Sequence, residues 1–301
     1  MERVIVSALA AWLFSSPLLA AETLDAKNNE TPINIPANPQ AIANIPAGFH
    51  FVTPGYLTVA TSASNSPPIG LWASDNKTLI GSDPDFARLL ADSLGLKLKL
   101  VPAAWEDWPL GITAGRYDVA MFNIAVTEER KKKFDFATYR ADNHAFAVKT
   151  NSAITAIKGR EDVAGKRIIV GSGTNQEKIL LSWDAKNRAQ GLAPVQPIYL
   201  NDDASATLAL LSGRADASFG PQAMAAWKVA SRGQTKIVGH GPFRAWVAVT
   251  TKKGNGLDTA LQQAINGAIA SGQYQQVLAR WGEQEEGVEA SQVNPPGIVY
   301  Q

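Results

Sequence analysis

Hydrophobic positions along the chain follow two patterns, short runs with strand-like spacing and longer stretches with helical spacing. Residues 56–61 (YLTVAT), 96–103 (LKLKLVPA) and 117–125 (YDVAMFNIA) have the strand pattern. Between them, residues 83–95 place apolar side chains at helical spacing, with aspartates at the start and a glycine at the end. A second helix is expected at 108–114. This alternation of strand and helix predicts an α/β fold with a parallel sheet.

The same order of elements begins again after residue 166. A strand at 167–170 leads through the Gly-rich turn GSGTNQE into a helix, and VQPIYL, SATLALLSG and ADASFG then read as strand, helix and strand. Both halves end in a helix, a Gly-Arg-x-Asp turn and a strand, so the sequence predicts two similar α/β lobes. A further strand in FRAWVAVTTKK and two helices over 256–282, broken near 271–273, complete the pattern.

The two ends of the chain have no such periodicity. Residues 1–21 contain one basic residue, a short apolar stretch and then a polar segment, which is the layout of a cleaved secretory signal peptide. A buried first helix is the alternative, but more than twenty polar, Pro-rich residues separate this stretch from the next hydrophobic element. We expect 22–53 to form an extended arm, lying on the folded body or hanging free, and 287–301 to form a tail. The expected product is soluble and periplasmic.

Composition removes several classes of function. The 301 residues are 46% hydrophobic and 18% charged, enough to supply two sizeable cores. Lys plus Arg number 28 and Asp plus Glu 27, and the basic run RKKK at 130–133 is typical of a solvated helix face, so no nucleic-acid partner is expected. The absence of cysteine excludes disulfides, thiol catalysis and a lipid-anchored cysteine. The three histidines have no ligand spacing and no G-x-S-x-G elbow occurs, so we expect neither metal nor cofactor.

Candidate binding residues follow the predicted strands, because ligands of α/β sheets bind beyond the carboxyl ends of the strands. The turn GSGTNQE lacks the G-K-[ST] ending of a P-loop and the third glycine of a dinucleotide site, so by itself it is a capped helix start. Opposite an arginine, however, its N–H groups would clamp a carboxylate. Trp105, beside Trp108, suits either the core or a wall that stacks on a ligand. The candidates are Ser62, Asn65, Trp105, Asn123, Thr127, Arg130, Gly173, Thr174 and Asn175.

Four blocks stand out together, in order and spacing. They are DFARLLADSLGLKLKLVPAAWEDWPLGITAGRYDVAMFNIAVTEERKKKFDFATY, IIVGSGTNQEKILL, LLSGRADASF and INGAIASGQYQQVLARWG. Together they resemble the periplasmic solute-binding proteins of polar amino-acid ABC transporters, the bacterial extracellular solute-binding protein family 3, over about 56–283. The resemblance implies a type II periplasmic binding protein: two Rossmann-like lobes joined by two crossing strands that close on a ligand like a hinge. Lobe 1 would comprise 54–147 and 243–286, and lobe 2 148–242.

The resemblance also implies roles for the candidates. Arg130, in the family's T-x-E-R element, would hold the ligand carboxylate, and Thr174 and Asn175 with their N–H groups would meet it from the second lobe. Trp105 matches a position that packs on the ligand side chain. Ser62, Asn65 and Asn123 would line the same pocket. The partners implied are a small carboxylate-bearing ligand and an inner-membrane ABC permease, and we expect a monomer.

Three positions depart from the family's pattern. Pro221 stands where the family usually has an aspartate that pairs with a ligand α-ammonium, Asn65 replaces an aromatic lid, and Ala125 replaces a hydroxyl. An ammonium without a counter-charge in a closed cleft is costly, so we expect weakened binding of ordinary α-amino acids. Asp202 or Asp203 could substitute, although at least one is expected to cap the following helix.

We therefore expect a binding component of an ABC importer that takes up an amino acid or a derivative, and not an enzyme. Two alternatives stay open. One is an enzyme similar to cyclohexadienyl dehydratase on the same fold, for which the available pocket acids are Asp202, Asp203 and Glu106. The other is a ligand-binding sensor subunit that reports to a membrane kinase.

Overall fold

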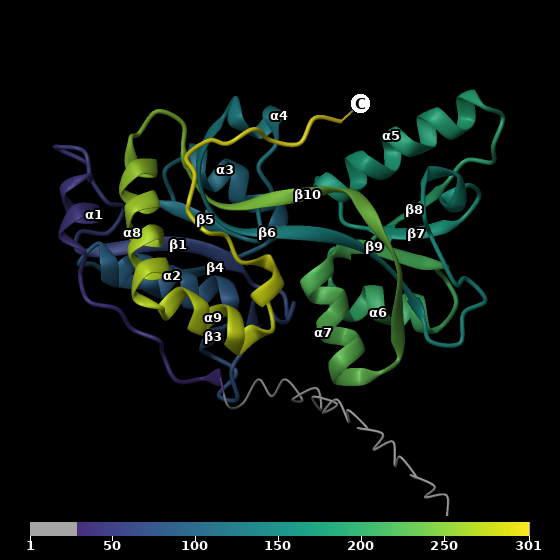
Figure 1. Ribbon diagram of the computed structural model, residues 1–301, viewed down its shortest axis with the longest axis horizontal. Helices are drawn as coiled ribbons and strands as arrows, with labels where there is room; N and C mark the ends of the chain where they lie inside the picture. The colour runs from purple at the N-terminus through teal and green to yellow at the C-terminus, as the bar shows by residue number, and fades with distance from the viewer. Residues whose placement is uncertain (1–28, 301) are drawn as a thin grey trace, which may run out of the picture.

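The computed structural model describes residues 29–300, so the signal peptide predicted at 1–21 lies outside the described residues. Two lobes stand side by side and share one eight-stranded sheet, in the order β4-β1-β5-β10-β6-β9-β7-β8 (Figure 1). The strands are β1 (Tyr56–Ser62), β2 (Leu71–Trp72), β3 (Leu79–Ile80), β4 (Lys97–Ala103), β5 (Val119–Met121), β6 (Phe134–Lys149), β7 (Arg167–Val170), β8 (Gln196–Tyr199), β9 (Ala217–Pro221) and β10 (Thr235–Lys252). The helices are α1 (Pro39–Ala43), α2 (Ser82–Ser93), α3 (Trp108–Thr113), α4 (Glu128–Lys131), α5 (Asn175–Ala189), α6 (Asp203–Leu211), α7 (Gln222–Arg232), α8 (Leu257–Ser271) and α9 (Gln273–Trp281).

The two lobes repeat one arrangement of strands. In lobe 1, β1 lies between β4 and β5 and pairs with both in parallel. In lobe 2, β7 lies between β8 and β9, again in parallel. The helix α5 covers one face of the lobe 2 strands, and α6 and α7 cover the other (Figure 1). The predicted pair of similar α/β lobes is confirmed.

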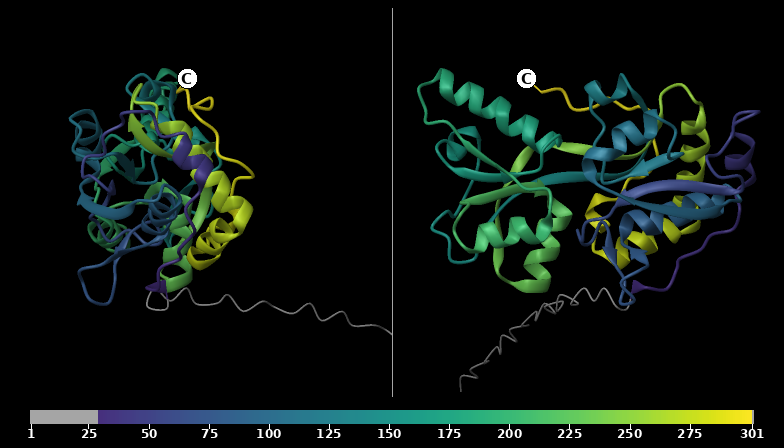
Figure 2. Two further views of the ribbon diagram at one scale, coloured as in Figure 1. Left: turned by 90° about the vertical axis from the view of Figure 1, so that its left-hand side faces the viewer. Right: turned by 180° about the vertical axis from the view of Figure 1, so that it is seen from behind.

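Two long antiparallel strands, β6 and β10, run through both lobes (Figure 2). The sequence predicted the second of them only from Phe243, whereas β10 begins at Thr235. A bulge between His240 and Arg244 interrupts the pairing, and its Gly-Pro pair hides the strand pattern. Because both strands pass unbroken from one lobe to the other, the exact residues that divide the lobes remain a prediction.

The strand predicted at 117–125 is shorter in the structure. β5 ends at Met121, and Asn123 has a positive φ of 53° that turns the backbone out of the strand. Beyond this turn only Ala125 rejoins the sheet, through a single bridge to Val247. The turn places the Asn123 side chain beside the cleft.

The arm at the start of the described chain lies on lobe 1, whereas the tail at its end runs along lobe 1 and reaches lobe 2, where the Tyr300 ring lies 5.6 Å from Lys178 Nζ. In the arm, Ile33 and Ala41 are buried in the lobe 1 core, and the N–H of Asn38 donates to the Ser93 carbonyl (2.8 Å). The arm also forms α1, a single short helix too brief to show periodicity in the sequence. In the tail, the N–H of Ile298 donates to the Val126 carbonyl (3.0 Å). Arm and tail are therefore both packed parts of the folded body.

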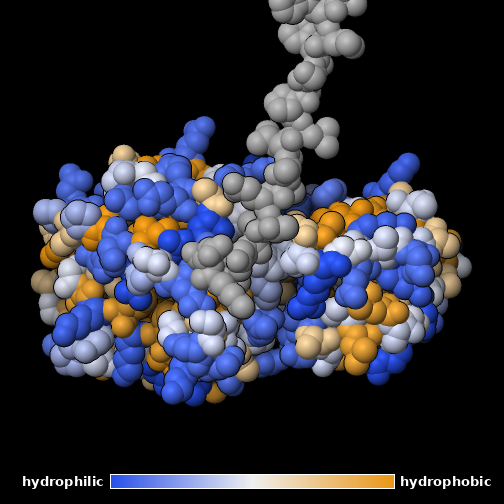
Figure 3. Space-filling model, turned by 90° about the horizontal axis from the view of Figure 1, so that it is seen from below, coloured by the Kyte–Doolittle hydropathy of each residue, from blue (hydrophilic) through white to orange (hydrophobic). Residues whose placement is uncertain are grey.

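The face of the molecule seen from below is largely polar. Figure 3 shows the molecule from below, with small apolar patches among polar residues on both lobes. Scattered exposed residues such as Leu110 and Leu208 are normal for a globular protein. Within residues 29–300 we find no helix with the length and hydropathy that a membrane span requires.

Candidate ligand-binding site

A cavity of about 210 Å³ lies between the lobes, with walls from both. Lobe 1 contributes the loop after β1 together with Trp105 and Phe122, and lobe 2 contributes residues from β7, β9, α6 and α7. Six predicted residues line it: Ser62, Trp105, Asn123, Thr174, Asn175 and Asp202. Arg130, Thr127, Gly173 and Asn65 are not part of its wall.

Arg130 nevertheless reaches the second lobe beside the cavity. Thr127 caps α4 through its hydroxyl, which accepts from the Arg130 N–H (3.0 Å). The guanidinium Nη1 donates to the Ala125 carbonyl (2.9 Å), and Nη2 donates to the Gly173 carbonyl across the cleft (3.2 Å). These bonds use two of the five N–H donors of the guanidinium. Burial lowers the pKa of Arg130 from its ordinary value, although a guanidinium stays charged at neutral pH.

The start of α5 faces Arg130 from lobe 2. The Thr174 hydroxyl accepts from the Glu177 N–H (3.1 Å), and the Gly173 N–H donates to the Glu177 carboxylate (2.6 Å). The N–H of Gly173, expected to meet a ligand carboxylate, is thus engaged within the loop. The first N–H groups of a helix have no intrahelical acceptor, which leaves those of Thr174, Asn175 and Gln176 to bind an anion. All three residues line the cavity.

Trp105 joins the lobes next to Arg130. Its indole Nε1 donates to the Ser172 carbonyl of lobe 2 (3.1 Å). Its ring lies edge-on to Trp108 (centroids 6.0 Å apart) and 5.4 Å from the Arg130 guanidinium. Trp108 is buried and belongs to the core. Trp105 lines the cavity.

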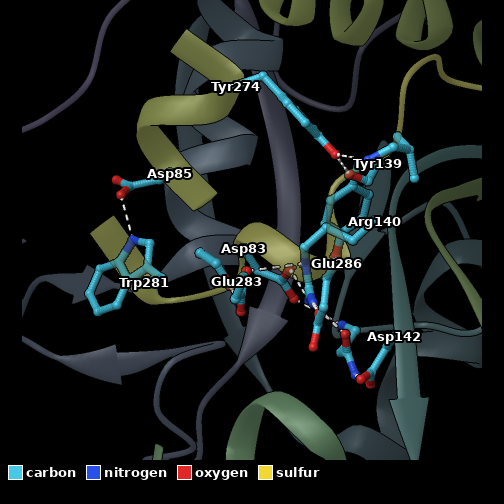
Figure 4. A network of polar contacts seen from close by, with 12 residues as sticks. Asp83, Asp85, Tyr139, Arg140, Asp142, Tyr274, Trp281, Glu283 and Glu286 are labelled. Carbon is cyan, nitrogen blue, oxygen red and sulfur yellow. Dashed lines mark hydrogen bonds and ion pairs between the residues drawn. The ribbon is translucent and has the colours of Figure 1, made fainter. Parts of the chain in front are cut away.

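Asn123 connects the cavity to a buried ionic network in lobe 1. Figure 4 shows this network around Arg140. The amide Nδ2 of Asn123 donates to Asp142 (2.9 Å), its carbonyl oxygen accepts from Arg140 Nη2 (2.6 Å), and its N–H donates to Asp83 (2.9 Å). Arg140 also pairs with Glu283 (Nε to Oε2, 3.3 Å) and with Glu286. Asn123 is therefore fixed by three bonds, as suits a residue that orients a ligand.

Burial dominates the protonation of this network. It raises the pKa of Asp83, raises that of Glu283 to about 8, and raises that of Asp142 well above its usual range; the Arg140 charge opposes each shift. One guanidinium cannot balance so many carboxylates, so part of the network is protonated at neutral pH. Within residues 29–300, no group of three or more His, Asp or Glu side chains is arranged to hold a metal ion.

The acidic side chains of the lobe 2 wall are both engaged. Asp202 caps α6 and accepts from the Ser205 N–H (2.7 Å). Hydrogen bonds from the side chain and then the backbone of Ser205 lower the pKa of Asp202. Asp203, only 8% exposed, forms an ion pair with Lys228 of α7. Pro221, at the end of β9, lines the cavity near them and brings no charge. The expectation that at least one aspartate caps the helix is confirmed for Asp202.

His144 is buried on β6, opposite Pro221 of β9. Burial lowers its pKa to about 4, opposed by the neighbouring Asn175 side chain. The imidazole is therefore neutral at physiological pH.

Sequence reasoning missed much of the lobe 2 wall. Thr207, Ser218, Met224, Ala225 and Lys228 line the cavity from α6, β9 and α7. These residues lie on helices and on β9, not in the loops that follow strands, where ligands of α/β sheets are expected. The one sequence feature that could have indicated these residues is the amphipathic pattern of α7, in which Lys228 lies between apolar residues.

Two lobes that share a cavity and are joined by two crossing strands define a type II periplasmic binding protein. The family model of bacterial extracellular solute-binding proteins, family 3, matches residues 57–284, and the chain belongs to this family. It is 32% identical over 221 residues to the L-cystine-binding protein TcyJ of Escherichia coli (strain K12), covering 71% of this chain and 78% of that protein. An ancestral arginine-binding protein bound to arginine is similar in structure, with a TM-score of 0.68 and 28% identity over 75% of this chain and 98% of that one.

One similar protein is an enzyme. Cyclohexadienyl dehydratase of Pseudomonas aeruginosa is 34% identical over 83 residues, which is 28% of this chain and 30% of the enzyme. The resemblance seen in the four sequence blocks is confirmed at the level of the family, and the enzyme similarity covers a minor part of the chain.

Proposed function

We propose that the protein is the periplasmic substrate-binding component of an ABC importer. It captures a small carboxylate-bearing solute, an amino acid or a derivative, in the cleft between its lobes and delivers it to an inner-membrane permease. The observation that carries the proposal is the contact of Arg130 with the start of α5. The guanidinium donates to the Gly173 carbonyl across the cleft, and the next three residues of the chain, 174–176, line the cavity and have N–H groups without an intrahelical acceptor. The family membership and the amino-acid-binding relatives support it.

The carboxylate would lie beside Gly173. Arg130 has N–H donors beyond those bonded to Ala125 and Gly173, and the first N–H groups of α5 lie next to Gly173 in the chain. Thr127 positions Arg130 rather than touching the ligand, because its hydroxyl accepts from the Arg130 N–H. Trp105 and Asn123 supply a stacking surface and a fixed amide on the lobe 1 side.

The test is thermal stabilisation and calorimetric titration with amino acids, N-acyl amino acids and organic acids. Binding should be lost or weakened by at least about tenfold in Arg130→Met, because charge-assisted hydrogen bonds contribute about 1.5–3 kcal/mol each. Lys133→Ala, an exposed change in the same basic run, is the matched control and should bind as the native protein does. Binding that survives Arg130→Met unchanged would show that the carboxylate site is wrong.

Binding rather than catalysis fits the charges of the cavity. An acid catalyst needs a carboxyl free to exchange a proton with the substrate, whereas Asp202 caps α6 and Asp203 pairs with Lys228. Incubation with prephenate or arogenate tests the enzyme alternative directly. Formation of an aromatic product at a rate above that of the free solution would favour the enzyme.

A further inference from the structure

We infer that the tail is part of the carboxylate site, because its residues 297–300 support the turn that carries Arg130. This inference rests on the proposed function and adds residues that act on the binding arginine from outside the cavity. The tail lies beyond the part of the chain that the family model matches, 57–284. Figure 1 shows the tail in yellow, running from lobe 1 towards α5.

Arg130 lies on a short element that needs support from its surroundings. α4 has four residues, and a helix of this length is not stable alone, because its nucleation is unfavourable. Within the turn, the Arg130 N–H donates to the Thr127 hydroxyl (3.0 Å), and the Lys131 N–H donates to the Thr127 carbonyl (3.0 Å). The direction of the Arg130 side chain therefore depends on what fixes the backbone at Thr127.

The backbone that enters α4 lies between two neighbours, β10 and the tail. The Val126 N–H donates to the Trp246 carbonyl of β10 (2.8 Å). From the tail, the Ile298 N–H donates to the Val126 carbonyl (3.0 Å), and the Ile298 carbonyl accepts from the Glu128 N–H (3.2 Å). Ile298 thus pairs with Thr127 as neighbouring parallel strands do. Without the tail, both of these backbone groups would lose their partners, and the turn would have a neighbour on one side only.

The tail approaches the turn so closely that only glycine fits at position 297. A Cβ at Gly297 would lie 2.8 Å from the Cα and the carbonyl carbon of Thr127 and 2.9 Å from the Glu128 nitrogen, closer than a Cβ approaches such atoms in protein structures. The Gly297 N–H also donates to the Glu128 carboxylate (2.7 Å), which pairs with Lys131 (3.0 Å). The tail therefore contacts both the backbone and the first side chain of α4.

Tyr300 extends these contacts to lobe 2. Its ring packs against the hydrophobic cluster that includes Ile179 of α5, and Lys178 Nζ lies 5.6 Å from the ring centroid. Burial raises the pKa of Tyr300 to about 12, and the Arg130 charge opposes this rise, so the phenol lies within the field of the guanidinium. Because the first residues of α5 line the cavity, the tail contacts both elements of the proposed carboxylate site.

The tail acts through Arg130 rather than on the ligand. None of its described residues, 287–300, lines the cavity. Gly297, Ile298 and Tyr300 are therefore positioning residues. A shift of the tail would move Thr127 and the guanidinium with it, and a misplacement of about 1 Å is enough to loosen a binding site.

The first experiment compares Gly297→Ala with Gly159→Ala, its matched control. A Cβ at Gly159 would meet a flexible carboxylate oxygen of Glu161 at 3.4 Å, which is an ordinary contact. The probes are the amino acids, N-acyl amino acids and organic acids that test the proposed function, L-arginine and L-cystine among them, and calorimetry gives Kd. Gly297→Ala should weaken the binding of these probes by at least about tenfold, as the loss of a charge-assisted hydrogen bond does, and Gly159→Ala should bind as the native protein does.

The outcomes separate the inference from the proposed function. Native affinity in Gly297→Ala, together with weakened binding in Arg130→Met, would overturn the inference and leave the proposed function intact. No binding of any probe to the native protein would instead contradict the proposed function.

A double-variant cycle separates positioning from a general structural role. Arg130→Lys keeps a cation but loses the planar fork, whose bonds depend on its orientation more than those of a flexible ammonium do. In this background, Gly297→Ala should weaken binding by less than about threefold, because the two changes act on one interaction. A full tenfold loss in both backgrounds would show that the tail acts independently of Arg130, against the inference.

Tyr300→Ala and Tyr300→Phe test the contact with lobe 2. The Tyr300 hydroxyl has no hydrogen-bond partner among residues 29–300, and the ring supplies the contact with Lys178. Tyr300→Phe should therefore bind as the native protein does, whereas Tyr300→Ala should lose about threefold in affinity. Native affinity in Tyr300→Ala would contradict the role of the ring.

Circular dichroism and melting temperature verify that each variant folds. Ile298→Ala is a second variant that introduces no clash, because it only removes a side chain that packs on Ala125 and Ala245. It should weaken binding in the Arg130 background of the native protein and leave binding in Arg130→Lys nearly unchanged. Native affinity in folded Ile298→Ala and Gly297→Ala alike would rule out the tail as a support of Arg130.

Discussion

Arg140 sets the charge balance at the centre of lobe 1. It is completely buried and faces Asp83, Glu283 and Glu286. Charges buried in this way are costly unless paired, and one guanidinium serves several carboxyls. The network is therefore stable only while some of its carboxyls keep their protons, and this gives the protein a stability that depends on pH.

Glu283 is the residue through which this dependence can be measured. Burial raises its pKa from 4.5 to about 8, so the folded protein holds a proton that the unfolded chain releases. Its contribution to stability is present below pH 4.5 and is lost as pH rises towards 8. Between these limits, the free energy of unfolding should fall by up to about 1.4 kcal/mol per pH unit. Glu283→Gln stays neutral, so its stability should be flatter with pH in denaturant titrations from pH 5.5 to 8.

His144 acts in the opposite direction, because a pKa lowered to about 4 destabilises the fold as pH falls below 6.5. His144 is the same in the native protein and in Glu283→Gln, so its effect cancels when their free energies of unfolding are subtracted at each pH. Glu285→Gln, a change on the neighbouring exposed side chain, is the control and should keep the native profile. An identical slope in Glu283→Gln and native protein would mean that Glu283 is ionised in the fold.

The buried network around Arg140 could not be predicted from the sequence. Asp83 had an ordinary place at a helix start, and Arg140 and Glu283 lie far from it in the chain. Their meeting depends on the packing of α2, β6 and the segment after α9, which no local pattern contains. Trp105 and Arg130 were foreseen because each follows a strand and matches a family motif, whereas Lys228 sits within a helix and matched nothing. The ligand roles of all the predicted residues stay predictions.

The helices and strands with a long, unbroken hydrophobic pattern were predicted well. β1 and α2 have five or more residues of unbroken pattern, and the structure confirms both. α1 was missed because it has a single turn, and the first part of β10 because glycine and proline interrupt it. The strand predicted at 117–125 was longer than β5, because the apolar run in the sequence continues past Asn123, where the backbone leaves the strand. α1 does begin at a local signal, because the Asn38 side chain caps it by accepting from the Gln40 N–H (3.0 Å) and Pro39 follows at its first position.

The tail is an element that only the structure reveals as packed. Asn294 adopts a positive φ of 47°, and its side chain accepts from the Phe136 N–H (2.9 Å) and donates to Asp135 (3.0 Å). Asn294→Ala removes both bonds and leaves the strained φ, so we expect a loss of about 1–3 kcal/mol in the free energy of unfolding. Urea titration measures it.

Asn76→Ala is the matched control for the backbone. Asn76 has a similar φ of 55° but is exposed, so its replacement carries the same backbone strain without removing side-chain bonds to a buried partner. The difference between the two variants isolates the side-chain contacts of Asn294. Equal losses would mean that the tail contributes nothing through these bonds.

Considered together, the lobes are held in a closed arrangement by contacts across the cleft. Trp105 and Arg130 each donate from lobe 1 to a carbonyl of the loop before α5, and Glu129 pairs with Lys178. The first two lie beside the cavity, and the ion pair lies on the surface. A hinge protein binds its ligand with the affinity of the closed form multiplied by the fraction of molecules that are closed.

Trp105→Phe is the test of this coupling. It keeps an aromatic ring but removes the N–H that donates to Ser172, a bond worth about 1 kcal/mol, so the ratio of closed to open protein should fall about fivefold. Small-angle scattering of the free protein should then show a larger radius of gyration. Glu129→Gln removes only the exposed pair and should change the radius little, since such pairs contribute about 0–1 kcal/mol. Unchanged scattering in Trp105→Phe would show that this contact follows closure rather than favouring it.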